Sequence, residues 1–93
     1  MEPEKVNSNK FKVEDIIYNN GDFSIAYGLF VDGGNCIAMR WNGVDSNMGF
    51  PKSSGKPTWF VVHNKLKIEF LKSLLQSEFS ENQKIIQILK NEI

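Results

Sequence analysis

The chain has 93 residues, of which 41% are hydrophobic and 24% charged, and its 11 lysines and arginines balance 11 acidic residues. These values are typical of one small globular domain and exclude a disordered chain or a strongly charged protein drawn to nucleic acid or membranes by its overall field. No stretch is apolar enough for a membrane helix, so we expect a soluble protein without a membrane partner. The single cysteine, Cys36, excludes an intramolecular disulfide, and we therefore expect a reducing, cytoplasmic location.

The first ten residues are polar and contain no apolar run. We expect a flexible N-terminal tail over residues 1–10, without a signal peptide, and a single domain over residues 11–93. A domain of this size has a modest core, and association with other chains is a common way to stabilise it.

Three strands joined by two tight turns are predicted in the first half of the chain. Residues 11–18 alternate apolar and polar side chains, and Asn20-Gly21 tolerates the positive φ angles that a two-residue hairpin turn requires. Residues 23–31 are rich in β-branched and aromatic residues. Gly33-Gly34 is a second turn candidate, followed by a third strand over residues 36–41.

These turns predict a register for the strands. The predicted pairs are Ile16–Ile25, Tyr18–Phe23, Phe30–Ile37, Gly28–Met39 and Ala26–Trp41. The same register places Arg40 opposite Tyr27, close enough for a cation–π contact. A slip of one residue would exchange the two faces of a strand, so the register also decides which side chains are buried.

The second half of the chain begins with a long irregular connection over residues 42–57, rich in Gly, Ser, Asn and Pro. A fourth strand is predicted over residues 58–62. Two helices follow, the first over residues 65–77 with Asn64 as its cap, and the second starting at the capping box of residues 80–83. The predicted fold class is α+β: a four-stranded, mainly antiparallel sheet with a meander and two C-terminal helices.

Catalytic and metal chemistry find little support. One histidine and one cysteine cannot supply the three or four ligands of an ordinary zinc site, and no pattern brings Cys36 and His63 together as a dyad. The glycine-rich segment at residues 49–57 lacks the spacing and the Ser/Thr of a phosphate loop. We expect no metal and no cofactor, and the sequence favours a non-enzymatic protein without deciding the point.

Apolar surface is the strongest functional signal. Both faces of the predicted sheet are apolar, and two helices in so short a chain readily cover only one of them. The other face would then expose a larger patch than monomers tolerate, so we expect a homo-oligomer or a protein partner. The residues expected at this interface are Tyr18, Phe23, Ile25, Tyr27, Leu29 and Arg40. The alternative is that the helices divide between the faces or that the long connection folds over one of them.

Two other functions remain open. Residues 50–72 combine five lysines with Phe50, Trp59 and Phe60, and lysines with aromatic rings are typical of single-strand nucleic-acid binding, although the net charge is zero. The long connection is a candidate for binding a small molecule or an anion, because long connections in compact domains are often functional. The candidate contacts for that ligand are Lys52, Ser53, Ser54, Lys56, Trp41 and Trp59.

The segments at residues 39–43 (Met-Arg-Trp-Asn-Gly) and 55–62 (Gly-Lys-Pro-Thr-Trp-Phe-Val-Val) resemble parts of short uncharacterised bacterial proteins carried on mobile elements, such as integron gene cassettes or phages. This resemblance covers the middle of the chain. It implies a small cytoplasmic protein acting by protein contact, as an adaptor or an inhibitor, and it brings no catalytic or binding residue with it.

Overall fold

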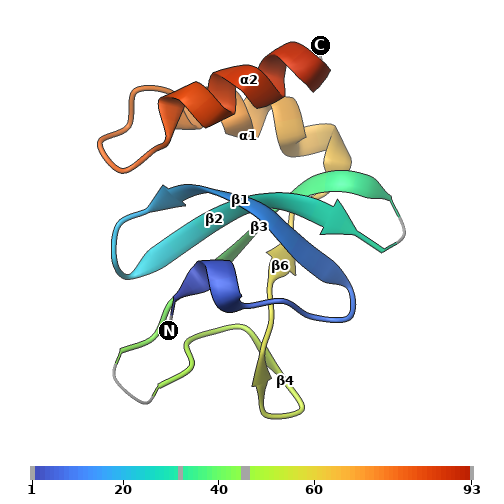
Figure 1. The fold of residues 1–93 in the computed structure, drawn as a ribbon, viewed down its shortest axis with the longest axis vertical. Coiled ribbons are helices and arrows are strands. Elements are labelled where there is room, and N and C mark those ends of the chain that lie inside the picture. Colours follow the sequence, from blue (N-terminus) through green and yellow to red (C-terminus); the bar gives the residue numbers. More distant parts are fainter. Residues whose placement is uncertain (1, 32, 45–46, 93) are drawn as a thin grey trace.

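A four-stranded antiparallel sheet forms the centre of the computed structural model, which describes residues 2–31, 33–44 and 47–92. Its strands are β1 (Phe11–Asn19), β2 (Phe23–Phe30), β3 (Gly34–Trp41) and the short β6 (Phe60–Val61), in the spatial order β1-β2-β3-β6. Helices α1 (Lys67–Leu74) and α2 (Asn82–Glu92) lie together over one face of this sheet (Figure 1). The predicted α+β fold is confirmed.

Several shorter elements differ from the predictions. The long connection contains a hairpin of its own, β4 (Lys52–Ser53) paired with β5 (Lys56–Pro57), so it is not without structure. The predicted first helix is divided into the 3-10 helix η2 (Asn64–Leu66) and α1. His63 rather than Asn64 caps η2, because its Nδ1 accepts a hydrogen bond from the Lys65 amide at 3.1 Å.

The pairing of β1 with β2 agrees with the predicted register only at the start of β1. Phe11 lies opposite Phe30, and the alignment is then shifted by two irregularities, so that Tyr18 faces Ile25 rather than Phe23. The turn is wider than a two-residue loop, because the Asn20 side chain accepts hydrogen bonds from two backbone amides beyond it. The predicted pairs of Ile16 and Tyr18 are therefore wrong.

The pairing of β2 with β3 is three residues away from the predicted register. The observed pairs include Tyr27–Ile37, Ile25–Met39 and Phe23–Trp41. Because the shift is odd, it exchanges the two faces of β3. Arg40 consequently lies opposite Ser24 on the face away from the helices, and the predicted contact between Arg40 and Tyr27 is wrong.

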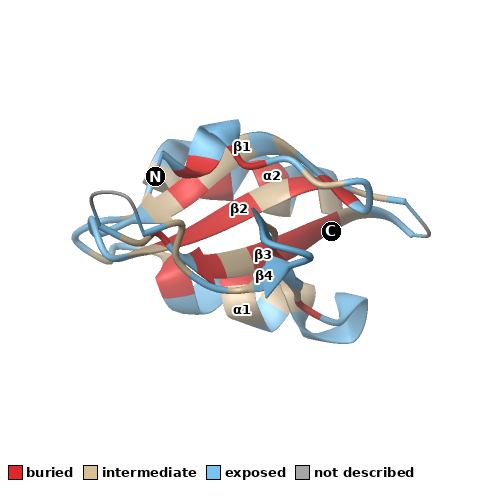
Figure 2. Cartoon of the chain, turned by 90° about the horizontal axis from the view of Figure 1, so that it is seen from below, coloured by how far each residue is buried: buried red, intermediate tan, exposed pale blue. Residues whose placement is uncertain are grey.

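Both faces of the sheet are covered within the described residues, which corrects the expectation of one uncovered face. The core under the helices is formed by Ile17, Ile25, Ile37, Val62, Leu71, Leu74, Ile85 and Ile88. The core of the opposite face is formed by Val6, Phe11, Ala26, Cys36, Ala38 and Trp59. Figure 2 shows the buried stretches of β2 and β3 along the middle of the sheet.

The N-terminal segment is part of the second cover. Residues Pro3–Lys5 form the 3-10 helix η1, and Val6 is buried. The Val6 carbonyl accepts a hydrogen bond from the indole Nε1 of Trp59 at 2.6 Å. Val6 and the segment around it therefore pack against the face of the sheet opposite the helices, which is called the lower face below.

A small polar network joins the two helices to the sheet. Lys67 Nζ and the Tyr27 hydroxyl both donate to one carboxylate oxygen of Glu92, at 3.0 and 2.9 Å. Burial and the bond to Glu92 raise the pKa of Tyr27. Burial opposes ionisation of Glu92, but the hydrogen bonds from Lys67 and Tyr27 outweigh it and hold its pKa below the usual range. Among the described residues, no helix is long and apolar enough to cross a membrane.

This network predicts a pH dependence of stability. A carboxylate with a lowered folded pKa stabilises the fold above its unfolded pKa of about 4.3, and this contribution is lost as the pH falls through the folded value. Glu92→Gln should lower the free energy of unfolding by about 1 kcal/mol at neutral pH, and the difference from wild type should be smaller at about pH 3, below the unfolded pKa. Urea unfolding at both pH values measures this. The exposed Glu69→Gln is the control, and a Glu92→Gln deficit that stays constant with pH would contradict the assignment.

Candidate binding surface

Three consecutive residues at the end of β3 determine the geometry of the candidate surface. Side chains alternate along a strand, so Arg40 and Asn42 point to the face away from the helices while Trp41 points to the other. Arg40 and Asn42 are buried, but Trp41 is 55% exposed. The two buried polar side chains each hold a neighbouring loop, and the aromatic ring between them is presented to the outside.

Arg40 holds the connection between β3 and β6. The residue is 1% exposed, and its guanidinium donates hydrogen bonds to the backbone carbonyls of Met48 and Thr58 and a longer one of 3.5 Å to that of Pro51. It also lies 5.9 Å from the centre of the Trp59 ring, within the range of a cation–π contact. Burial lowers the pKa of this guanidinium. One side chain therefore fixes the path of a long loop at three places.

Asn42 holds the turn between β1 and β2. Its Oδ1 accepts a hydrogen bond from the Ser24 hydroxyl at 2.6 Å, and its Nδ2 donates to Asn19 Oδ1 at 3.1 Å and to the Gly21 carbonyl at 3.0 Å. The backbone N–H of Asn42 also donates to the backbone carbonyl of Asp22 at 2.7 Å. These bonds place the turn, and Asp22 with it, beside the end of β3.

Gly49 allows the loop to return along β3. Its φ angle is +76°, and a Cβ atom here would overlap the Trp41 carbonyl oxygen and crowd the Arg40 guanidinium. Only glycine fits such a close backbone approach without strain. Directly after it, the Phe50 and Trp41 backbones exchange two hydrogen bonds, of 2.7 and 3.1 Å. Phe50 is thereby fixed as the neighbour of Trp41 on the outer edge of β3.

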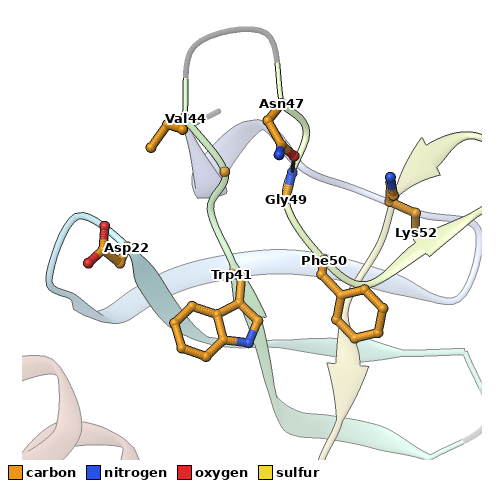
Figure 3. Close-up of a pocket in the computed structure, with 8 residues that line it drawn as sticks. Asp22, Trp41, Val44, Asn47, Gly49, Phe50 and Lys52 are labelled. Atoms are coloured by element: carbon orange, nitrogen blue, oxygen red, sulfur yellow. Dashed lines mark hydrogen bonds between the residues drawn. The ribbon is translucent and has the colours of Figure 1, made fainter.

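Trp41, Phe50 and Phe60 together form an exposed aromatic surface. Phe50 pairs with Trp41, and Phe60 pairs with Met39 one step back along the same edge, so all three rings lie on the face that carries the helices. Phe50 is 64% exposed and Phe60 63%. The Trp41 ring rests edge-to-face on Phe23, with ring centres 4.9 Å apart. Figure 3 shows the Trp41 and Phe50 rings side by side and directed to the same side.

A shallow hollow of about 450 Å³ adjoins the aromatic surface. Its lining consists of Asp22, Trp41, Gly43, Val44, Asn47, Gly49, Phe50 and Lys52. Asp22 lies on the side of the β1–β2 turn and Lys52 on the side of β4, with the two rings between them (Figure 3). The hollow therefore has an acidic end, an aromatic middle and a basic end.

Most residues predicted for the protein interface lie elsewhere. Phe23, Ile25 and Tyr27 pack against the core under α1 and α2, and Arg40 is buried on the opposite face. Tyr18 is half-buried and lies edge-to-face against Phe79, and Leu29 is partly exposed at the far end of β2. The helices therefore cover the face of β2 that carries Phe23, Ile25 and Tyr27.

The predicted ligand contacts are only partly brought together. Trp41 and Lys52 border one hollow, whereas Ser53, Ser54 and Lys56 are exposed on the β4–β5 hairpin outside its lining. Trp59 is 6% exposed and faces the N-terminal segment. Asp22 and Val44, which also line the hollow, were not among the contacts predicted from the sequence. Their proximity depends on the true register of β2 and β3, which the turn residues did not reveal.

Other candidate groups are dispersed. Trp59 in the segment of residues 50–72 is buried, and Lys67 is engaged by Glu92 and the Asn35 carbonyl, so lysines and aromatic rings do not form one continuous face. Cys36 is buried in β3, and His63 is exposed at the start of η2. No metal-binding group of three His, Cys, Asp or Glu side chains occurs within residues 2–31, 33–44 and 47–92.

Comparisons with protein-family models, with curated proteins and with solved structures give no match. The interpretation of the aromatic surface therefore depends on its own geometry.

The role of Arg40 gives a testable prediction. Arg40→Lys keeps a positive charge but cannot reach three carbonyls, so it should lower the free energy of unfolding by about 2–4 kcal/mol. In Arg40→Lys, the backbone amides of Trp41 and Phe50, which depend on the position of the loop, should exchange with deuterium faster than in the wild type. The increase should be larger than for the amides in the middle of β2. Lys56→Met, on the exposed hairpin, is the control for loss of a cation. Unchanged protection of Trp41 and Phe50 would contradict the role given to Arg40.

Proposed function

We propose that this protein is a non-enzymatic interaction module that works by protein contact and forms a homo-oligomer through its aromatic surface. The supporting observation is that Trp41, Phe50 and Phe60 are each more than half exposed on one face, although the chain covers both sides of its sheet. An aromatic side chain removes about 150–250 Å² from water when it is enclosed, so three half-exposed rings leave roughly 300 Å² or more open. Apolar patches of this size on monomers are often functional.

The rigidity of the surface supports the same proposal. Phe50 is tied to the Trp41 backbone, and the loop that carries Phe50 is held by the buried Arg40. Rings that are already ordered lose little conformational entropy on binding, and aromatic residues are enriched at the centres of protein interfaces. A loop that only had to cover the lower face of the sheet would not need its aromatic ring fixed outward.

The sheet edges favour contact through side chains rather than through an added strand. At the β1 edge, the backbone of Ile17 and Asn19 already bonds to the segment before α2, through Glu81 and Phe79. On the other side, β3 is paired with Phe50 at Trp41 and with β6 at Ala38 and Met39, and β6, the outer strand, is only two residues long. Edges filled in this way offer few free backbone groups for pairing with another chain. We therefore assign the contact to the exposed rings.

Single-strand nucleic-acid binding is the second candidate. Its support is that aromatic rings on a sheet face, with Lys52 beside them, resemble a platform for stacked bases. Asp22 borders the same hollow and would repel a phosphate backbone there. Retention of a labelled oligothymidylate that weakens with salt would favour this candidate over protein contact.

We also infer a cytoplasmic location from the lone, buried thiol of Cys36, since secreted domains of this size usually carry disulfides. The resemblance to mobile-element proteins is compatible with an adaptor or inhibitor that acts in that compartment.

The proposed association predicts a concentration-dependent mass. Light scattering should give more than one chain mass at high concentration, and Phe50→Ser combined with Phe60→Ser should return the protein to a monomer, because the rings are the contact. Leu66→Ser, which alters an exposed apolar side chain on η2 outside the surface, is the matched control. The indole NMR signal of Trp41 should move with concentration while that of the buried Trp59 stays fixed. A wild-type monomer at every concentration would refute the proposal.

A further inference from the structure

We infer that the aromatic surface receives one second copy of the chain, related to the first by a two-fold axis and aligned by contacts between Asp22 and Lys52. This inference rests on the proposed function and adds the stoichiometry, the symmetry and the residues that select the partner. It depends on the order of charges around the hollow rather than on apolar exposure alone.

Four side chains follow one another across the end of the sheet in the order Asp22, Trp41, Phe50, Lys52 (Figure 3). The backbone explains this order. Asp22 adjoins the strand on one side of Trp41 and bonds to Asn42 through its carbonyl, while Phe50 pairs with Trp41 on the other side and leads into Lys52. The row therefore has a negative end and a positive end, separated by two aromatic rings.

Such a row is complementary to its own reverse. A two-fold axis between Trp41 and Phe50 turns the row end to end, which brings the second copy's Lys52 to Asp22 and the second copy's Asp22 to Lys52. The same rotation sets each Trp41 against the Phe50 of the other copy. A self-complementary patch of this kind is what an isologous two-fold interface requires.

Both charges are available for this contact. Asp22 and Lys52 are exposed, and neither takes part in an ion pair within the described part of the chain. A purely basic partner would be attracted by Asp22 and repelled by Lys52, and a purely acidic partner would be attracted by Lys52 and repelled by Asp22. The second copy satisfies both ends at once, and this charge complementarity distinguishes it from other occupants.

The size of the surface sets the strength and the limit of association. Three rings and a polar rim fall at the lower end of specific interfaces, below about 1,200 Å² of total buried area, where complexes are weak and reversible. An isologous contact uses the patch on both copies, so assembly stops at two chains. The expected species is a dimer in equilibrium with the monomer.

Charge reversal tests the pairing. Asp22→Lys places lysine against Lys52, and Lys52→Glu places glutamate against Asp22, so each variant alone should raise the dimer dissociation constant about tenfold or more. When the two variants are mixed, both contacts regain opposite charges, and the heterodimer should form in preference to either homodimer. Sedimentation equilibrium and native mass spectrometry measure these species. Lys56→Glu makes the same charge change outside the hollow and should leave dimerisation unchanged.

The outcomes separate this inference from the proposed function. Loss of dimers in the Phe50→Ser/Phe60→Ser variant, with no response to either charge reversal, would keep the surface as the interface and overturn the two-fold pairing. Masses that grow beyond two chains with concentration would also overturn it. A wild-type chain that stays monomeric, or one whose rings bind only oligothymidylate or a different protein, would refute the second copy as occupant. Preferred heterodimers in the mixture support the inference directly.

Discussion

The structure on the side of the sheet away from the helices depends on the hydrogen bonds of the buried Arg40 guanidinium. A charged group without contact to water is unfavourable unless it donates hydrogen bonds, and here its two terminal nitrogens donate to the backbone carbonyls of Met48 and Thr58, while Nε has no partner within the described residues. The loop must pass close to Arg40 for these bonds to form. That path brings Trp59 under the sheet as a core residue and Phe50 alongside Trp41 as a surface residue. One desolvated cation thus links the closure of the second core to the display of the aromatic rings.

Alternation along β3 separates these two roles. Ala38 and Arg40 point away from the helices, where Ala38 belongs to the second core and Arg40 holds the loop. Met39 and Trp41, which alternate with them, point to the face that carries the helices. A change at Trp41 therefore leaves the groups that hold the loops in place, whereas a change at Arg40 disturbs both core and surface. The aromatic surface can vary in this arrangement while the fold is retained.

The sequence was sufficient for the three long strands and the two helical regions, but not for the short elements or for the alignment of the strands. Alternating patterns and helical spacing predicted the sheet and the two helices, because these signals are local. The register depended on reading Gly33-Gly34 as a two-residue turn, whereas β3 begins at Gly34, which pairs with Phe30. The odd shift moved Arg40 from the expected interface into the interior. Both faces of β3 carry apolar residues, so no pattern in the sequence could distinguish the two alignments. The hydrogen bonds of Arg40 and Asn42 arise only after folding and have no sequence signature.

Coverage of the sheet explains why a surface remains at all. Both helices lie on one face of the sheet, so the other face is closed by Val6 and Trp59. Val6 comes from the N-terminal segment, and Trp59 from the end of the connection between β3 and β6. The loop that delivers Trp59 has to turn around the end of β3, and the cover of α1 and α2 leaves Trp41 more than half open there. The Trp41 ring therefore belongs to neither of the two cores. Its exposure, together with that of Phe50 beside it, follows from how a short chain divides the cover of its sheet between two faces.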